Sequence, residues 1–242
     1  EEGGAVIELA DVEVPGGSAR MTAYYMPRGD SLATRATVNI DRFDYGVVAR
    51  RADPSTTLGG TFSLNLHVDS TAPRLAQSLR TGTGYLDFVV WPERLDASVF
   101  DLWSTNILLA VLPVIGSDVS RLNCWLGELD LTDGKLVSRR LLIDTTNSRT
   151  LGAARANLAD NALEMRLVPR PKVPQFFALA TPIEVTGTFE DFGVRIRPFD
   201  VFETVVRWAS SLVVVPFQRL TTRPLPADGS DACLLEPRAP PP

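Results

Sequence analysis

The sequence predicts a mainly β fold with a few inserted helices, an architecture of the α+β class. Three observations predict it: apolar and polar residues alternate over many short stretches, turn sequences separate these stretches, and few segments show helical spacing. The regular alternation of strands and helices that is typical of nucleotide-binding sheets is absent from the pattern.

The clearest strand signal is the stretch GGTFSLNLHVDST, residues 59–71. Its alternation puts apolar side chains on one face of a strand and polar side chains on the other. The apolar face would hold Phe62, Leu64, Leu66 and Val68. Burying one such side chain stabilises a fold by about 1.5–3 kcal/mol. The face therefore needs a cover, which is the protein's own core, another protein or a lipid chain.

Nine further stretches are predicted as strands on the same grounds. They cover residues 5–14, 21–26, 34–43, 84–91, 122–131, 135–144, 151–158, 162–169 and 181–189. Asp133-Gly134 between two apolar runs is a strong hairpin signal. Ala159-Asp160-Asn161 indicates a second hairpin. Strand predictions therefore extend over most of the chain.

Three segments are predicted as helices. The first covers residues 72–80, with Pro73 in its first turn. The second covers residues 96–112, and the third covers residues 200–215 with apolar side chains at helical spacing. The tail, residues 224–242, is rich in proline and polar residues and is predicted to be extended.

Composition limits the classes of function. The chain has 242 residues with 24 Lys and Arg against 29 Asp and Glu, a formal net charge of −5. Nucleic-acid binding requires a basic face, so this balance argues against it. The most apolar run, residues 107–115, has nine residues, whereas a membrane-spanning helix needs about 20. The composition is that of an ordinary folded protein.

The two cysteines, Cys124 and Cys233, do not have the spacing of a metal site, so no metal is expected. In an oxidising compartment they could form one disulfide. The alternative is two unrelated thiols, one of them buried in a strand. The sequence leaves both alternatives open.

Nothing in the sequence indicates catalysis or a bound cofactor. The chain has one histidine, His67, on the polar side of the strand at 59–71, where a solvated surface histidine is the favoured interpretation. No GxSxG motif provides a nucleophile, and no spacing singles out a pair of carboxylates. We expect a protein that is not an enzyme.

One weak cluster of basic residues lies in the sequence RLVPRPK. Its cations are Arg166, Arg170 and Lys172, and Arg195 and Arg197 follow nearby. Such cations can bind phosphate headgroups. The alternative is a solvated sheet edge whose charges discourage aggregation.

Residues 122–198 contain a series of motifs that resembles a known family. The motifs are Asn123-Cys124, Asp133-Gly134, LLIDT (141–145), NLADNALEMRLVPRPK (157–172) and TPIEVTGTF (181–189). Their order and spacing resemble the C-terminal domain of the AsmA-like proteins of Gram-negative bacteria. Upstream, FDYGVVARR (43–51), GGTFSLNLHVDS (59–70) and the helix APRLAQSL resemble the earlier half of that domain. The resemblance covers about residues 34–198, and Gly152 stands where the family has a more glycine-rich strand.

The resemblance implies a curled, antiparallel-rich sheet that forms a β-groove with an apolar floor, as in the related bridge-like lipid transfer proteins. It implies a periplasmic protein held in the inner membrane by an anchor outside this chain. The implied role is outer-membrane biogenesis through glycerophospholipid transport between the two membranes, without catalytic residues. An oxidising periplasm would permit the disulfide between Cys124 and Cys233. The expected partners are phospholipid and a protein of the periplasm or outer membrane, and not nucleic acid.

These expectations divide the chain into four parts. Residues 1–33 are leading strands, either of this domain or of a preceding groove repeat; residues 34–198 are the AsmA-like domain; residues 199–223 are a helical region; and residues 224–242 are the proline-rich tail.

The expected groove floor consists of apolar residues from two of the predicted strands. They are Phe62, Leu64, Leu66 and Val68, followed by Leu163, Met165 and Leu167. The alternative is that these faces pack on the helices at 96–112 and 200–215 as an ordinary core. A second hypothesis for the whole chain is a structural adaptor that caps a groove, or docks an assembly partner, without binding lipid.

Overall fold

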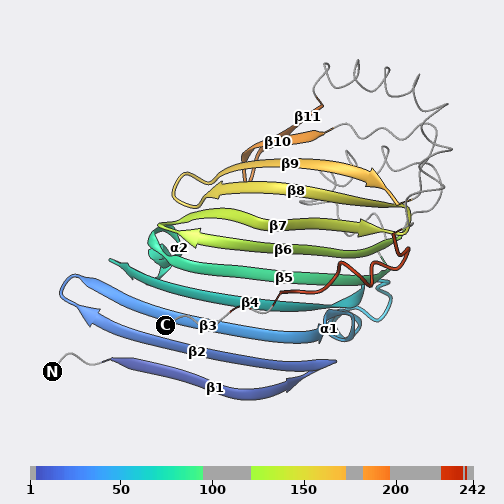
Figure 1. Ribbon diagram of the computed structural model, residues 1–242. Coiled ribbons are helices and arrows are strands. Elements are labelled where there is room, and N and C mark those ends of the chain that lie inside the picture. Colours follow the sequence, from blue (N-terminus) through green and yellow to red (C-terminus); the bar gives the residue numbers. More distant parts are fainter. Residues whose placement is uncertain (1–3, 95–120, 173–181, 197–224, 237, 239–242) are drawn as a thin grey trace, which may run out of the picture.

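The computed structural model describes residues 4–94, 121–172, 182–196, 225–236 and 238. Within these ranges the chain forms a single 11-stranded sheet in which the strands lie side by side in sequence order (Figure 1). Every neighbouring pair is antiparallel. The prediction of a mainly β fold is confirmed.

The strands agree closely with the sequence predictions. They are β1 Ala5–Val14, β2 Gly17–Arg28, β3 Ser31–Asp44, β4 Gly59–Ala72, β5 Thr83–Arg94, β6 Leu122–Thr132, β7 Lys135–Thr145, β8 Ser148–Asn157, β9 Ala162–Pro171, β10 Ile183–Thr188 and β11 Phe192–Ile196. All ten predicted strands are present. The strand β11 was not predicted, because its five residues offer too short an alternation to stand out.

The described helices are few and short. They are α1 Tyr45–Ala52, the 3-10 turn η1 Leu75–Gln77 and α2 Ser78–Thr81. The helix predicted at 72–80 is therefore reduced to two short turns, because Leu75 and Leu79 are exposed and no apolar face stabilises a longer helix. The helices predicted at 96–112 and 200–215 lie outside the described residues.

The helix α1 was not predicted from helical periodicity. It begins where β3 ends, and Asp44 caps it by accepting a hydrogen bond from the backbone N–H of Val47 at 2.9 Å. Arg50 and Arg51 in its last turn complement the partial negative charge of the helix C-terminus. The capping signal was present in the sequence, but the helix has only eight residues.

Both predicted hairpins form as expected. Asp133 and Gly134 both have positive φ, at 48° and 73°, as the tight turn between β6 and β7 requires. Asn161, with φ of 56°, closes the hairpin of β8 and β9. Gly134 also lies against the backbone: a Cβ added there would approach the carbonyl oxygen of Arg80 to 2.0 Å. Only glycine fits this position.

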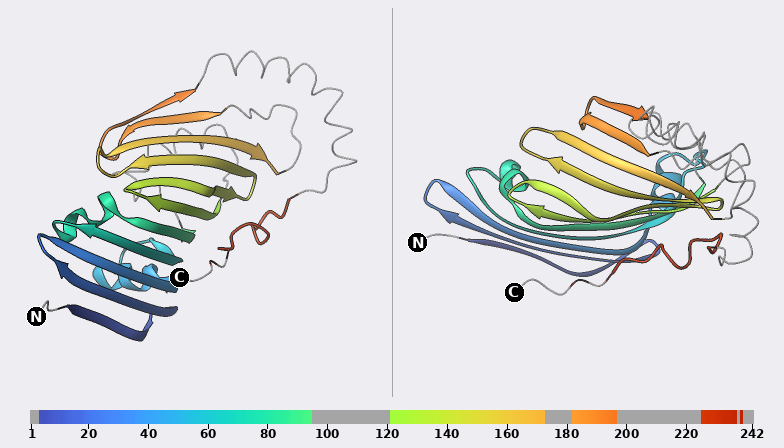
Figure 2. Two further views of the ribbon diagram at one scale, coloured as in Figure 1. Left: turned by 60° about the vertical axis from the view of Figure 1, so that its left-hand side comes forward. Right: turned by 45° about the horizontal axis from the view of Figure 1, so that its top comes forward.

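The sheet bends along the length of its strands, so that it has a concave and a convex face (Figure 2). The short helices lie on the concave side, and the C-terminal residues cross the convex side (Figure 2). We call residues 225–236 and 238 the C-terminal strap. This shape is consistent with the groove that the family resemblance implies.

Candidate functional site

The candidate site is the concave face of the sheet, because the strand register aligns apolar residues of neighbouring strands on this face. On β4, Leu64 lies opposite Ile40 of β3 and Phe88 of β5, and Leu66 lies opposite Val38 and Leu86. The alternate residues, Asn65 and His67, therefore point to the convex face. The face with Leu64 and Leu66 is the apolar one.

The same face continues to the last strands. Across the centre of the sheet, register aligns Val90 with Trp125, Leu86 with Leu129, Trp125 with Ile143, and Ile143 with Thr150. Further along, it aligns Ala156 with Leu163, Ala154 with Met165, Leu167 with Ile183, and Val185 with Val194. All seven residues expected on the groove floor therefore share one face, although the two groups of residues lie on β4 and β9.

These seven residues differ in how much they are covered. Val68, Leu163 and Leu167 are buried, whereas Phe62, Leu64, Leu66 and Met165 are only partly buried. Leu167 packs in a cluster with Leu141, Ala154 and Ile183, which Met165 and Val194 flank. Val68 lies beneath the end of α2, because a Cβ at Gly82 would contact its Cγ1 at 3.0 Å. Val68 is therefore covered by the end of α2, and the expected packing on the helices at 96–112 and 200–215 lies outside the described residues.

Aromatic side chains enlarge the apolar surface of the partly buried region. Phe43 and Phe62 have ring centroids 5.3 Å apart, and Phe88 meets Trp125 edge-on at 5.5 Å. The Phe88 ring lies over Gly127, where a Cβ would approach it to 2.5 Å. These rings add apolar surface to that of Leu64 and Leu66, so this region can bury hydrocarbon.

His67 lies on the polar face as predicted, but it is not solvated. Its ring is 3% exposed, accepts or donates a hydrogen bond with Thr37 Oγ1 at 3.0 Å, and makes a second with Asp69 Oδ2 at 3.0 Å. Thr37 lies on the neighbouring strand β3, and Asp69 lies two residues further along β4. His67 is a satisfied buried histidine, and the prediction of a surface histidine was wrong.

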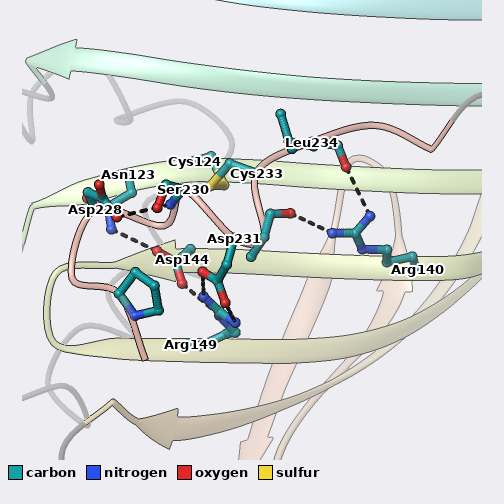
Figure 3. Close-up of a disulfide and its surroundings, with 12 residues drawn as sticks. Asn123, Cys124, Arg140, Asp144, Arg149, Asp228, Ser230, Asp231, Cys233 and Leu234 are labelled. Atoms are coloured by element: carbon teal, nitrogen blue, oxygen red, sulfur yellow. Dashed lines mark hydrogen bonds and ion pairs between the residues drawn. A yellow bond between two sulfur atoms is a disulfide. The ribbon is translucent and has the colours of Figure 1, made fainter. Parts of the chain in front are cut away.

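The convex face has its own apolar cluster, which the C-terminal strap covers. Val89, Leu126 and Leu142 from three adjacent strands pack against Ala232 of the strap. Cys124 of β6 forms a disulfide with Cys233 of the strap, 109 residues later, with a Cα–Cα distance of 5.9 Å (Figure 3). Of the two alternatives for the cysteines, the structure has the bonded pair.

Ion pairs fix the strap at one end of the cluster. The fully buried carboxylate of Asp144 accepts hydrogen bonds from Lys172 Nζ at 2.6 Å, Arg149 Nε at 2.9 Å and Asn123 Nδ2 at 2.7 Å. The Arg149 guanidinium also donates two hydrogen bonds to Asp231 of the strap, at 2.6 and 3.0 Å (Figure 3). These hydrogen bonds lower the pKa of the Asp231 carboxyl.

A second set of ion pairs and hydrogen bonds fixes the other end of the strap. Arg238 donates to both carboxylate oxygens of Asp87, at 2.5 and 2.7 Å, and to Asp130 at 2.6 Å. Glu128, which is buried, accepts the backbone N–H of Glu236 at 2.9 Å. Hydrogen bonding to the two acids raises the pKa of Arg238, although its partial burial opposes the shift. Without the strap, Asp87 would be a buried charge without this partner.

The three cations expected at headgroups do not lie with the apolar floor. Lys172 is 4% exposed, and its ammonium donates to Asp144 and to the carbonyl oxygens of Pro226 and Ala227. It supports the strap, which corrects the expectation for this residue. Arg166 and Arg170 are exposed, but they occupy the alternate positions of β9 and so point to the convex side.

Comparison with known proteins adds one relative. No protein-family model matches the chain, and no solved structure matches it. The AsmA family protein YhjG of Escherichia coli (strain K12) is 26% identical over 118 residues, which are 48% of this chain and 17% of that protein. A distant AsmA-like relationship is supported. The chain thus spans less than a fifth of the length of this relative.

Among the described helices, none has the length and hydrophobicity needed to cross a bilayer.

Proposed function

We propose that the chain is a lipid-handling module of an AsmA-like protein. In this proposal it serves outer-membrane biogenesis by moving glycerophospholipid between the inner and outer membranes. The observation that carries the proposal is the concave face, on which strand register aligns mainly apolar residues from β2 to β11. The similarity to an AsmA family protein supports it.

The physical basis is burial of acyl chains. Each buried methylene group contributes about 0.8 kcal/mol, so a chain lying along the floor binds without any directional contact. Because rings and aliphatic groups offer similar contacts along the floor, a bound chain can slide from strand to strand. Headgroups would remain in water at the rim. No chemical step is required, so the module is not an enzyme.

The proposed location is the periplasm, with attachment to the inner membrane outside this chain. The disulfide between Cys124 and Cys233 supports this location, because disulfides persist in oxidising compartments such as the periplasm.

The decisive experiment combines lipid extraction with photocrosslinking. The protein is purified without detergent, and phospholipid is quantified by mass spectrometry against a control protein. A photoreactive amino acid is placed at Leu64 or Leu66 on the concave face, and at Asn65 of the same strand as the matched control. We expect lipid adducts from positions 64 and 66 and none from position 65.

The alternative is an adaptor domain that caps a groove or docks a partner without binding lipid. The burial of Val68, Leu163 and Leu167 favours it, because parts of the floor are already packed. Phospholipid at the level of the control protein, with no adduct from position 64 or 66, would establish this alternative for the chain.

A further inference from the structure

A hollow on the convex face lies away from the proposed lipid floor. Its volume is about 490 Å³, within the range of small-ligand sites. The strands β2 to β5 form its base, and Leu234 and Leu235 of the C-terminal strap form one wall. The polar lining includes Arg20, Asn39 and Asn65.

Arg42 at this hollow has an unusual backbone. Three non-glycine residues of the described chain have positive φ, and two of them, Asp133 and Asn161, lie in hairpin turns. Arg42, with φ of 53°, instead lies in a bulge of β3, where Asp41 and Arg42 together oppose one residue of β4. A long side chain in this conformation is uncommon and often marks a functional position.

Neighbouring groups hold the bulge in place. The backbone N–H of Arg42 donates to Ser63 Oγ at 3.0 Å, and the Ser63 hydroxyl donates to Asp41 Oδ1 at 3.1 Å. The start of β2 comes very close: a Cβ at Gly17, its first residue, would lie 1.9 Å from the Asp41 carbonyl oxygen. The glycine at position 17 therefore permits the bulge.

The bulge places the guanidinium of Arg42 over an aromatic ring. Its Cζ lies 3.7 Å from the centroid of the Trp91 ring. A contact with the face of a ring uses the positive charge of the guanidinium and occupies none of its N–H donors with an acceptor atom. The side chain is exposed and has no ion-pair partner among the residues that the structure describes. It is a preorganised donor fork of the kind that binds carboxylates.

The rest of the lining selects among anions. Asp41 lies at the same hollow, and its negative charge disfavours a multiply charged phosphate. The Asn39 and Asn65 amides, from adjacent strands, can pair with the N–H and C=O groups of a peptide backbone. Leu234 is 60% exposed and offers an apolar wall.

We propose that this hollow binds the C-terminal carboxylate of a partner protein whose last residue is apolar. Arg42 holds the carboxylate, the asparagine amides hold the adjacent backbone, and Leu234 and Leu235 contact the terminal side chain. The site lies on the face opposite the lipid floor, so it does not depend on the proposed lipid function.

The test measures binding of N-acetyl-Ala-Ala-Leu by isothermal titration calorimetry, with the C-terminal amide of the same peptide for comparison. We expect the amide to bind at least tenfold more weakly. Arg42→Gly removes the guanidinium at a position where glycine suits the backbone. This variant should bind the free-acid peptide at least tenfold more weakly. Arg155→Gln removes the same charge from the convex face of β8 and should change the affinity less than twofold.

Several outcomes would overturn the proposal. One is that the free-acid peptide shows no measurable binding. Another is that the acid and the amide bind equally well. A third is that Arg42→Gly binds the free-acid peptide as tightly as the natural sequence does. Inorganic phosphate or octanoate binding as tightly as the peptide would also overturn it, because the site would then recognise phosphate or a fatty acid. Circular dichroism of each variant checks that the fold is retained.

Discussion

At the scale of single residues, charge burial distinguishes two otherwise similar ion pairs of the convex face. Asp87 is fully buried, and Arg238 of the strap binds both of its oxygens. Asp69 is partly exposed, and its Oδ1 accepts a hydrogen bond from Arg35 Nε at 2.6 Å. A buried carboxylate that loses its partner cannot be rehydrated without opening the structure, whereas an exposed one is simply hydrated.

The first prediction concerns these two arginines. Arg238→Ala should lower the free energy of unfolding by about 3–5 kcal/mol, because it leaves Asp87 buried without its cation. Arg35→Ala should change the free energy of unfolding far less, because its exposed partner Asp69 is hydrated when the arginine is removed. Urea unfolding followed by circular dichroism measures both values. Equal losses for the two variants would contradict this account of the strap.

The second prediction is a pH dependence at Asp231. Hydrogen bonds from Arg149 lower the pKa of this carboxyl below its ordinary value of 3.8, so the folded protein holds the carboxylate more readily than the unfolded chain does. The stabilisation is complete above the unfolded pKa and is lost as the pH falls through the lowered folded pKa. Asp231→Asn should therefore destabilise by up to about 1 kcal/mol at pH 7, and by less as the pH falls below 3.8.

Unfolding curves at several pH values test this prediction. Asp30→Asn, which removes a carboxylate from the exposed turn between β2 and β3, is the control and should show no such pH-dependent difference. A destabilisation by Asp231→Asn that does not shrink as the pH falls below 3.8 would show that the carboxylate charge is not its cause.

At the scale of elements, the disulfide attaches the strap to β6. Joining residues 109 positions apart removes much of the conformational freedom of the unfolded chain, and the chain-entropy model assigns about 4–5 kcal/mol to a loop of that length. The double variant Cys124→Ala with Cys233→Ala should lose stability of this order in urea unfolding. Reductant should have the same effect on the natural sequence and none on the variant. A loss below about 1 kcal/mol would contradict the entropic account.

Prediction from sequence succeeded for elements that local patterns determine. The alternation around Leu64 and the turn at Asp133-Gly134 each act within one strand or hairpin, so ten strands were predictable. The burial of His67 and the pairing of Lys172 were not predictable. His67 is paired with Thr37 of the neighbouring strand β3, and Lys172 with Asp144 of β7 and with Pro226 of the strap, which is more than 50 residues away. No local pattern encodes such contacts between strands.

The same limit applies to the candidate site. Alternation along β4 and β9 indicated which residues share a face within each strand, and register then places both sets on the concave side. The expected headgroup cations were chosen because they are close in sequence, without regard to the face. Arg42 was missed because its conformation arises from a bulge, although the glycines at positions 16 and 17 were a visible signal of close chain approach.

At the scale of the whole molecule, the sheet follows the order of the chain, and each of the described strands bonds to its neighbours among them in sequence. Such contacts are local, so each new strand can add to the edge of the preceding one as synthesis proceeds. The strap is the exception, because its cysteine lies 109 residues after the one that it joins. A bonded cysteine pair thus marks a chain already synthesised as far as Cys233. During biosynthesis, formation of the disulfide at Cys124 would therefore indicate that all the strands of the sheet have been synthesised.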